Sequence, residues 1–475
     1  MADAGPAGHG LQERGDLAGR RVVLLGLGRF GGGLGAARWL LGQGAELTVT
    51  DKAAPETLAG PAAELAAAGA RLVLGGHDDV DFAAADLLVV NPAVPLDAPP
   101  VRAALDAGVP VTSEICLLVS RWPGPVLGVT GSNGKSTVTG LCHALLATAG
   151  RAASLGGNIG GSLLDRVERA EPGEVAVLEL SSFMLDLLAR EGLGPEVAVI
   201  TNITPNHLDR HGSMEAYAAA KRSILQRART AVLFAEDELV REAADAFSGR
   251  ALWFGGEGDV RIGEDGGLLD RRGEALLASA AIPLPGRANR LNLAAALLAV
   301  SAVLGDEVAA TRALPGALAS YELPPHRCQP VGTWGGVEWI DDSASTTPES
   351  TRASLAAVGA PAILIAGGRD KGLDAAPLLD EAQRVARAVV ALGEQGPALA
   401  RELSSRGVVT EVVPDVETAV ARAAALSRPG DTVLLSPGYS SHDSHANFVE
   451  RSEAYVRAVL AHAARLPLSR QREEC

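Results

Sequence analysis

The feature that most constrains the fold of this chain is a repeated alternation between two kinds of apolar segment. Short, continuously hydrophobic runs such as RVVLLGLG (21–28), VAVLELSS (175–182) and AILIAGG (362–368) end in Gly or Ser. Longer Ala- and Leu-rich stretches, for example 136–150 and 288–305, lie between such runs. Runs without polar alternation suit strands buried on both faces of a parallel sheet. Their alternation with helix-length segments predicts an α/β fold.

The length of 475 residues is enough for two to four domains. Two proline-containing segments interrupt the alternation, RWPGP at 121–125 and LPPHR at 323–327. They predict three domains covering residues 1–122, 123–324 and 325–475, and residues 1–19 are expected to be disordered.

The charge balance limits the classes of partner. The net charge is −15, so the chain has no basic stripe of the kind that displaces counterions from nucleic acid. No apolar stretch reaches the roughly 20 residues of a membrane span, and the N-terminus has no secretory pattern. The four cysteines form no CxxC pair, which argues against a zinc site. We expect a cytoplasmic protein, working as a monomer, without nucleic-acid or membrane partners.

The segment GVTGSNGKST (128–137) has the composition of a phosphate-binding loop. Glycines let backbone N–H groups converge on an anion, while Lys135 and Ser136 would reach the terminal phosphates and Mg²⁺. The spacing departs from the strict pattern, because five residues rather than four separate Gly128 from Gly134. A Gly-rich turn without a ligand is the alternative.

A second glycine motif, GLGRFG (26–31), follows a strand and precedes a helix, and Asp51 ends the next strand. This pattern places a diphosphate at a helix N-terminus and an acid on a ribose hydroxyl. It fits NAD, but equally a UDP-sugar, and the alternative is a turn required for close helix packing. A dehydrogenase has no need of an ATP-type loop, which argues against NAD and leaves other diphosphate-bearing nucleotides open.

Three further polar clusters follow predicted strands or lie in glycine turns: GGNIGG (156–161), ELSSF (179–183) and TNITPNHLDRHGS (201–213). Ligands collect at the carboxyl ends of strands in open α/β sheets. Glu179 ends a buried run, where an acid requires a partner or a metal, and His207 and Asp209 are its candidate companions. Taken singly, each has a plainer explanation: a paired acid, a capping Asn or a surface His.

Together, the ordered motifs resemble those of the Mur ligase family, and most closely its glutamate-adding branch. The resemblance extends over about residues 20–460. In addition to the segments above it rests on LPPHR, DDSASTT (341–347), GGRDKG (367–372) and LSPGYSSHDSHANF (435–448). It implies a Rossmann-like N-terminal domain for the UDP-sugar substrate, a central P-loop-type parallel-sheet ATPase domain, and a Rossmann-like C-terminal domain for the amino acid.

The resemblance also implies an activity. It is ATP-dependent amide ligation in cytoplasmic peptidoglycan precursor synthesis, adding glutamate to UDP-N-acetylmuramoyl-L-alanine through an acyl phosphate, with ADP and phosphate released and two Mg²⁺ sites. The implied catalytic residues are Lys135, His207, Lys221 and Arg327. The ATP-binding set is Gly131, Asn133, Gly134, Lys135, Ser136, Thr137, Asn289, Asn292 and Arg327. The UDP-sugar set is Gly28, Arg29, Phe30, Gly31, Asp51, Asn158 and Ser181. The glutamate set is Thr346, Lys371, Ser441 and Phe448, and the metal set is Ser136, Glu179, His207 and a carbamylated Lys221.

Several of these residues have plainer alternatives. Lys221 would ordinarily be a solvated lysine on a polar helix face, and Lys371 a surface turn residue. Phe448 would be a core aromatic, and Asn289 and Asn292 would be helix caps.

The sequence departs from the family pattern in the acceptor loop, where Ala344 and Thr347 replace a Lys and an Asn. Other departures are Asn91, Asn206, His442 and His445. Most of the branch uses D-glutamate, but a subclass that joins L-glutamate carries a loop like this one, so both isomers stay open. The competing hypotheses are another Mur or folylpolyglutamate-type ligase, an NAD-linked dehydrogenase, and a non-catalytic nucleotide-binding regulator.

Overall fold

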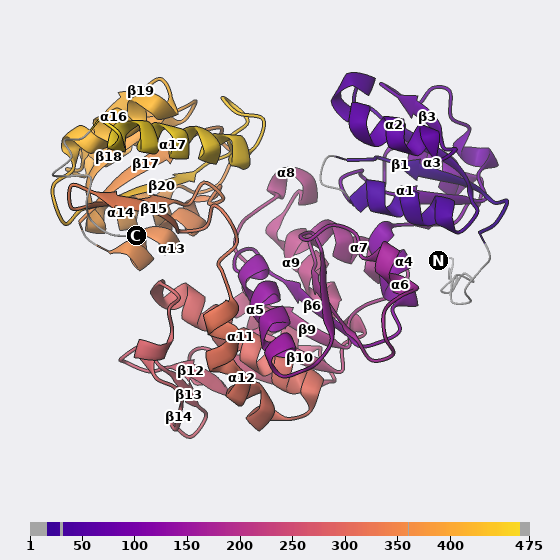
Figure 1. Cartoon of the computed structure of the whole chain (residues 1–475), viewed down its shortest axis with the longest axis horizontal. Coiled ribbons are helices and arrows are strands. Elements are labelled where there is room, and N and C mark those ends of the chain that lie inside the picture. Colours follow the sequence, from indigo (N-terminus) through magenta and orange to yellow (C-terminus); the bar gives the residue numbers. More distant parts are fainter. Residues whose placement is uncertain (1–16, 29–31, 360, 466–475) are drawn as a thin grey trace.

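The computed structural model describes residues 17–28, 32–359 and 361–465. In Figure 1 the chain forms three bodies, each built around one sheet. Helices alternate with strands in all three, so the predicted α/β class is confirmed. The sheets span residues 21–112, 126–277 and 329–438, and both proline-containing segments lie between sheets. We propose the predicted domain boundaries on that basis.

The first sheet is entirely parallel and has the order β3-β2-β1-β4-β5. Its strands are β1 (Arg21–Leu25), β2 (Glu46–Asp51), β3 (Arg71–Leu74), β4 (Leu87–Val90) and β5 (Val111–Thr112). Its helices are α1 (Gly32–Gly42), η1 (Pro55–Leu58), α2 (Ala59–Ala67), η2 (Phe82–Ala84), α3 (Pro99–Asp106) and α4 (Glu114–Arg121). The strand order reverses between β1 and β4, and a crevice at such a switch point is where open α/β sheets bind ligands.

The middle sheet has the order β14-β13-β12-β11-β10-β9-β6-β8-β7, and all its strand pairs are parallel except the two that β13 forms with β12 and β14. Its strands are β6 (Val126–Thr130), β7 (Ala153–Gly157), β8 (Val175–Glu179), β9 (Val197–Ile200), β10 (Thr230–Phe234), β11 (Arg250–Phe254), β12 (Val260–Ile262), β13 (Leu268–Asp270) and β14 (Ala275–Leu277). Strand β6 lies between β8 and β9, so the loop after β6 opens at the switch point of this sheet.

The helices of the middle body lie on both faces of its sheet (Figure 1). They are α5 (Lys135–Thr148), α6 (Leu164–Val167), α7 (Ser182–Arg190), α8 (Leu208–His211), α9 (Met214–Arg222), η3 (Ser223–Gln226), α10 (Glu238–Asp245), η4 (Ser279–Ala281), α11 (Gly286–Leu304) and α12 (Glu307–Ser320). Helices α5, α11 and α12 share one apolar cluster, and α7 and α9 belong to another on the opposite face.

The third sheet has the order β15-β16-β20-β17-β18-β19, with β15 antiparallel to its neighbour. Its strands are β15 (Gln329–Trp334), β16 (Val337–Asp341), β17 (Ala362–Gly367), β18 (Ala386–Leu392), β19 (Val409–Val413) and β20 (Thr432–Gly438). Its helices are α13 (Pro348–Val358), α14 (Ala376–Val385), α15 (Gly396–Ser405), α16 (Val416–Leu426) and α17 (Phe448–Ala463).

The hydrophobic cores join the first two bodies but separate the third. A single apolar cluster contains Leu24 of β1, Leu117 of α4 and Leu178 of β8. Among the described residues, the two clusters of the third body draw their buried members only from residues 337–459. The third body is therefore tied to the rest mainly through the linker after α12 and through contacts between side chains at its edge.

The N-terminal expectation requires a correction. Residues 1–16 lie outside the described residues, but Leu17 is 2% exposed and packs in the core shared by the first two bodies. Gly19 also donates its N–H to the carbonyl of Gly44. The expectation of disorder is therefore wrong for residues 17–19, because a buried leucine fixes the chain there.

The described residues also bear on the expectations about membrane spans and cysteines. Within the described ranges, no helix combines the length and apolar character that a membrane span requires. Cys116, Cys142 and Cys328 are free thiols.

Glu114 links the first body to the middle one. The hydroxyl of Ser162, in the loop after β7, donates to Glu114 Oε1 at 2.6 Å. Burial raises the pKa of Glu114 to about 7, and the hydrogen bond from Ser162 opposes that rise only in part. This carboxyl group therefore changes charge near neutral pH.

The raised pKa predicts a pH-dependent stability. In the unfolded chain a glutamate titrates near 4.3, so between that pH and 7 the folded state holds the extra proton and the free energy of unfolding falls as pH rises. Glu114→Gln keeps an acceptor for Ser162 but carries no charge. We expect it to raise the free energy of unfolding by about 3 kcal/mol at pH 8 and by about 1 kcal/mol near pH 5. Thermal midpoints at both pH values test this, with the exposed Glu64→Gln as the control. An equal change at both pH values would contradict it.

Candidate active site

The segment 128–137 forms a strand–turn–helix unit in which α5 begins at Lys135. The loop after β9 holds the turn, because Ser132 N donates to the carbonyl of Asn202 and Asn133 N donates to its Oδ1, each at 2.9 Å. The first N–H groups of a helix have no intrahelical acceptor, and they lie at the positive end of its dipole. This is the geometry with which helix N-termini bind phosphate.

Two glycines in the turn are required by its geometry. Gly131 has φ 148°, and a Cβ there would collide with the hydroxyl of Thr201. Gly134 has φ 82°, and a Cβ there would collide with the amide oxygen of Asn292 on α11. The turn is therefore packed against both β9 and α11, which leaves its outer side for a ligand.

The side chain of Lys135 folds back over the turn. Its Nζ donates to the carbonyls of Gly131 and Ser132, both at 3.0 Å. Burial lowers the pKa of Lys135, the carboxylate of Glu179 raises it, and the guanidinium of Arg327 lowers it. The positive charges of Lys135 and Arg327, which come from different domains, thus lie near one another beside the loop.

Glu179 is 2% exposed at the end of β8 and has a donor on each oxygen. Ser136 Oγ donates to Oε2 at 2.6 Å, and Asn158 Nδ2 donates to Oε1 at 2.8 Å. Among the described residues, no three His, Cys, Asp or Glu side chains gather as a metal centre. Ser136 and Glu179 nevertheless offer two adjacent oxygens, the ligand type that Mg²⁺ prefers when it also takes phosphate oxygens and water.

Lys221 on α9 is 2% exposed, so its interpretation as a solvated surface lysine is wrong. Its Nζ donates to the carbonyl of Gly131 at 2.8 Å and lies 4.7 Å from the centre of the Tyr217 ring. Burial lowers the pKa of Lys221 well below its ordinary value, Lys135 lowers it further, and Glu179 opposes both. A buried amine with a lowered pKa is the form that reacts as a nucleophile.

His207 lies apart from this group: its own side chain is exposed, and its ring contacts an aromatic cluster that contains the buried Tyr217. It caps α8 with φ 54°, and its ring lies 5.4 Å from that of Phe183 and 6.5 Å from that of Tyr217. Tyr217 reaches the phosphate loop through its hydroxyl, 3.1 Å from Ser132 Oγ. Asp209 belongs to the short helix α8 rather than to the loop in which it was expected.

The two asparagines of α11 are not helix caps. The residue before the helix is Pro285, and Asn289 Nδ2 donates to its carbonyl at 2.9 Å. Asn292 Nδ2 donates to Asn289 Oδ1 at 3.3 Å, and Asn292 touches the turn at Gly134. Thr137, in the first turn of α5, is 4% exposed, and its carbonyl accepts from the hydroxyl of Tyr321.

A cavity of about 630 Å³ opens between the phosphate loop, the linker after α12 and the third body. Ser136 lines it from the middle body, Arg327 from the linker, and Ala344 and Phe448 from the third body. Phe448 is 36% exposed, so its interpretation as a core aromatic is wrong. The structure thus brings the phosphate loop, the linker arginine and the acceptor loop to one space.

A separate cavity of about 360 Å³ lies at the switch point of the first sheet, lined by Gly28, Asp51, Lys52 and Asn91 among others. Asp51 Oδ2 accepts the N–H groups of Leu27 and Gly28, at 2.9 and 3.2 Å, so this carboxylate also holds the glycine turn. The expected contacts of Arg29, Phe30 and Gly31 lie outside the described residues.

Comparison with known proteins identifies the family. Models described as the "Mur ligase MurD-like, N-terminal domain", the "Mur ligase middle domain" and the "Mur ligase, glutamate ligase domain" match residues 20–113, 129–300 and 326–438. The chain is 40% identical over 466 residues to the UDP-N-acetylmuramoylalanine--D-glutamate ligase of Anaeromyxobacter dehalogenans, covering 93% of this chain and 98% of that protein. The chain belongs to the Mur ligase family. The protein of the same name from Pelotomaculum thermopropionicum is 36% identical over 94% of this chain and 98% of its own length.

Solved Mur ligases share the fold of this one. The UDP-N-acetylmuramate-alanine ligase MurC from Thermotoga maritima superposes with a TM-score of 0.61 at 20% identity, covering 93% of this chain and all of that one. MurF from the same organism, solved with ADP, gives 0.59 at 19% identity over 94% of this chain and all of its own. Family membership disfavours the dehydrogenase interpretation of GLGRFG, since that motif here belongs to a chain of ligase type.

The predicted acceptor residues of this Mur ligase lie in the loops before α13, after β17 and after β20 and at the start of α17, all in the third body. Lys371 Nζ donates to Thr346 Oγ1 at 2.9 Å, so Lys371 is not a simple surface turn residue. Ser441 is 3% exposed in the loop after β20, and that loop pairs with the Lys371 segment because the backbones of Ser440 and Arg369 exchange hydrogen bonds. Thr347, one of the departures from the family pattern, caps α13 with Ser350.

Several side chains at this site were missed in the sequence. His211 lies 2.9 Å from the hydroxyl of Ser182 and stacks on Phe183, and its spacing of four residues from His207 on a short helix was a usable signal. Ser181 itself caps α7 by accepting from Met184 N. Arg451, 1% exposed, donates to the hydroxyl and the carbonyl of Ser343, and burial lowers the pKa of Arg451 to about 10.

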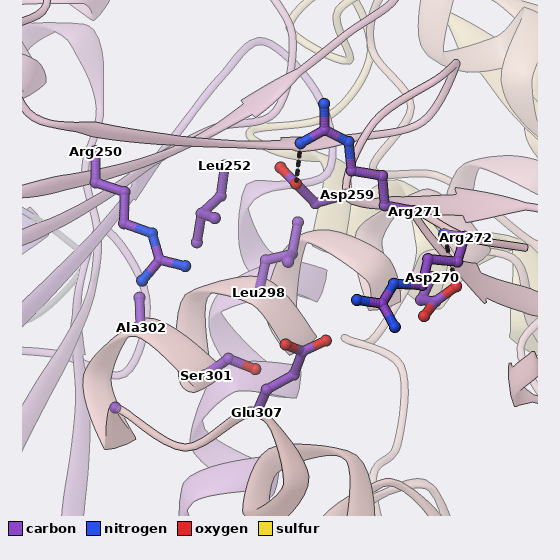
Figure 2. A pocket seen from close by; sticks show the side chains of 11 residues that line it. Arg250, Leu252, Asp259, Asp270, Arg271, Arg272, Leu298, Ser301, Ala302 and Glu307 are labelled. Carbon is purple, nitrogen blue, oxygen red and sulfur yellow. Dashed lines mark hydrogen bonds and ion pairs between the residues drawn. The ribbon is translucent and has the colours of Figure 1, made fainter. Parts of the chain in front are cut away.

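A further cavity of about 450 Å³ lies on the middle body (Figure 2). Leu252 and Leu298 form its floor, and Arg250 and Arg272 approach from opposite sides. It touches the C-terminal end of α11, whereas Asn289 and Asn292 near the phosphate loop lie at the N-terminal end. This cavity is therefore distinct from the site described above.

Proposed function

We propose that this Mur ligase uses ATP to join glutamate to UDP-N-acetylmuramoyl-L-alanine. The observation that carries the proposal is the convergence of Lys135, Ser136, Glu179 and Lys221 beside a cavity that Arg327 and Phe448 also line. Relatives that carry this name match over nearly the whole chain, which supports it.

The reaction proceeds in two balanced steps. A carboxylate oxygen of the alanyl group attacks the γ-phosphorus of ATP, ADP leaves, and an acyl phosphate forms. The amine of glutamate then attacks the acyl carbon, loses a proton, and phosphate leaves with the former carboxylate oxygen. Catalysis of phosphoryl transfer is chiefly positioning and charge stabilisation. Lys135 and Arg327 supply positive charge from two domains, and the first turn of α5 supplies N–H donors.

The residues of the loop fit a magnesium ion bound with the nucleotide. Ser136 and Glu179 would hold it, and Mg²⁺ supplies charge neutralisation at the phosphates when bound. Gly131, Asn133, Gly134 and Thr137 shape the loop around the phosphates, while Asn289 and Asn292 border the nucleotide from α11. His207 is assigned to a second metal site that forms with substrate.

Lys221 is assigned as a carbamate. Its buried amine would add to the carbon of CO₂ and lose a proton, which converts a cation into an anionic oxygen ligand. The lowered pKa of Lys221 favours the neutral amine that this addition requires. The carbamate would act beside Glu179 as support for the second metal.

The substrates have separate sites. The uridine diphosphate occupies the cavity at Gly28 and Asp51, with Asn158 and Ser181 meeting the sugar peptide nearer the phosphate loop. Lys371, Thr346, Ser441 and Phe448 receive glutamate, whose two carboxylates call for cationic and hydroxyl donors. The protein works as a monomer in the cytoplasm, where ATP and the UDP-linked substrate are found.

The stereochemistry of the acceptor is decided by experiment. Purified protein is given ATP, Mg²⁺ and UDP-N-acetylmuramoyl-L-alanine with D- or L-glutamate in parallel, and phosphate release and product mass are measured. Product with either isomer supports the ligase. Phosphate release with L-alanine, L-lysine or diaminopimelate instead of glutamate would identify another Mur-type ligase, and no ATP consumption with any acceptor would overturn the proposal.

A further inference from the structure

We propose that His326, Asp341 and Ser452 form a positioning cluster, which holds the linker that carries Arg327 in register with the acceptor loop. The proposal rests on the proposed function, because it concerns how that site is assembled. None of the three residues was singled out as a ligand of ATP, metal or glutamate, and they come from three separate elements: the linker, the end of β16 and α17.

The linker is strained on both sides of Arg327. Among the described residues other than glycine, the only positive φ angles are those of His207, His326 (64°) and Cys328 (43°). A left-handed conformation costs an L-residue about 1–2 kcal/mol, so it persists only where its surroundings hold it. The two strained residues that flank Arg327 therefore require specific anchors.

The anchor of His326 is a closed set of hydrogen bonds. Its Nδ1 lies 2.9 Å from Asp341 Oδ2 and 2.6 Å from Ser452 Oγ, and Ser452 Oγ donates to the same Asp341 oxygen at 2.5 Å. Because the serine hydroxyl has one proton and gives it to Asp341, the proton between the ring and these oxygens belongs to Nδ1. The ring is therefore fixed in both orientation and tautomer.

The same cluster holds the acceptor loop. Asp341 Oδ1 accepts the N–H of Ser343 at 3.0 Å, and the carbonyl of His326 accepts the N–H of Ala344 at 3.1 Å. The next acid, Asp342, accepts the N–H of Cys328 at 3.1 Å. The two strained linker residues and the first residues of the acceptor loop are thus bonded to one another directly.

The third member connects the cluster to the glutamate side of the cavity. Ser452 lies one helical turn after Phe448 on α17, and the Phe448 ring is 6.2 Å from the His326 ring. Since Arg327 and Phe448 line the same cavity as Ser136, a shift of the cluster would move a phosphate contact and an acceptor contact together. Misplacement by about 1 Å can cost a hundredfold in rate.

The test is a double-mutant cycle on kinetics. Ser452→Ala and Asp341→Asn are each expected to lower kcat about tenfold and to raise KM for glutamate, with KM for the UDP-linked substrate unchanged. If the residues act as a unit, the double variant will lose little more activity than either single variant does. The matched control is Asp431→Asn. Asp431 is another buried acid of the third body; it directly precedes β20 and forms an ion pair with Arg387 of β18. That variant is expected to lower the thermal midpoint without changing KM for glutamate.

Unchanged kinetics of both cluster variants would overturn the proposal. It would also be overturned if their activity losses were explained by lowered thermal stability, as any loss in Asp431→Asn would be. These outcomes differ from a failure of the proposed function, in which the unaltered protein would itself form no product with glutamate.

Discussion

Lys135→Ala is expected to lower kcat/KM for ATP-dependent product formation by about a thousandfold or more, because it removes preorganised charge from the transferring phosphoryl group. The charges of Glu179 and Arg327 both act on Lys135, and its Nζ is held over the turn by two carbonyls. Steady-state phosphate release, measured over a range of ATP concentrations with the other substrates saturating, gives kcat/KM and tests the effect.

The same substitution should leave the fold intact. The buried ammonium is disfavoured by its desolvation, so its removal is expected to leave the thermal midpoint unchanged or raised. Arg457→Ala, on the exposed face of α17, is the control for a lost cation far from the site. Activity of Lys135→Ala within about tenfold of the unaltered protein would contradict the assigned role.

Lys221→Met is expected to lower the rate by about a hundredfold or more while keeping or raising thermal stability at pH 7. The stability part concerns the free amine, in protein kept in bicarbonate-free buffer, and follows from linkage. The folded pKa of Lys221 lies well below the unfolded value near 10.4, so the unfolded chain binds more protons at neutral pH and the buried lysine destabilises the fold there. That destabilisation shrinks as pH rises toward 10, and methionine removes it.

The carbamate has its own signature. With ¹³C-labelled bicarbonate, the unaltered protein is expected to show a carbamate carbonyl resonance that is absent from Lys221→Met. A resonance of equal intensity in both, or full activity of Lys221→Met, would contradict carbamylation.

The strands that build the site could be predicted because strands that are buried on both faces consist almost entirely of apolar residues. Strands β8 and β17 are buried at every position and read as continuous apolar runs. The short strands β12, β13 and β14 were missed, since each has three residues and half-buried positions, and pairing with neighbours stabilises them more than their own apolar content does. The two-residue β5 was missed for the same reason.

The candidate site was predictable where a polar residue belongs to the phosphate-loop motif, as Ser136 does, or ends a buried strand, as Glu179 does. Lys221 was named only through the family resemblance. Its local pattern, AYAAAKRSI, is that of an exposed helix, and only the packing of α9 against the phosphate loop buries the amine. No local sequence pattern could have predicted the positioning cluster, since Ser452 is 111 residues from Asp341 and 126 from His326. Contacts at such separations come from topology and not from periodicity.

The proposed mechanism passes through an acyl phosphate formed on the alanyl carboxylate. UDP-N-acetylmuramoyl-L-alanine labelled with ¹⁸O in its terminal carboxylate is incubated with the enzyme, ATP, Mg²⁺ and the accepted glutamate isomer, and the released phosphate is analysed by mass. One ¹⁸O atom per phosphate is the result that the mechanism predicts. Unlabelled phosphate alongside lengthened peptide would contradict it.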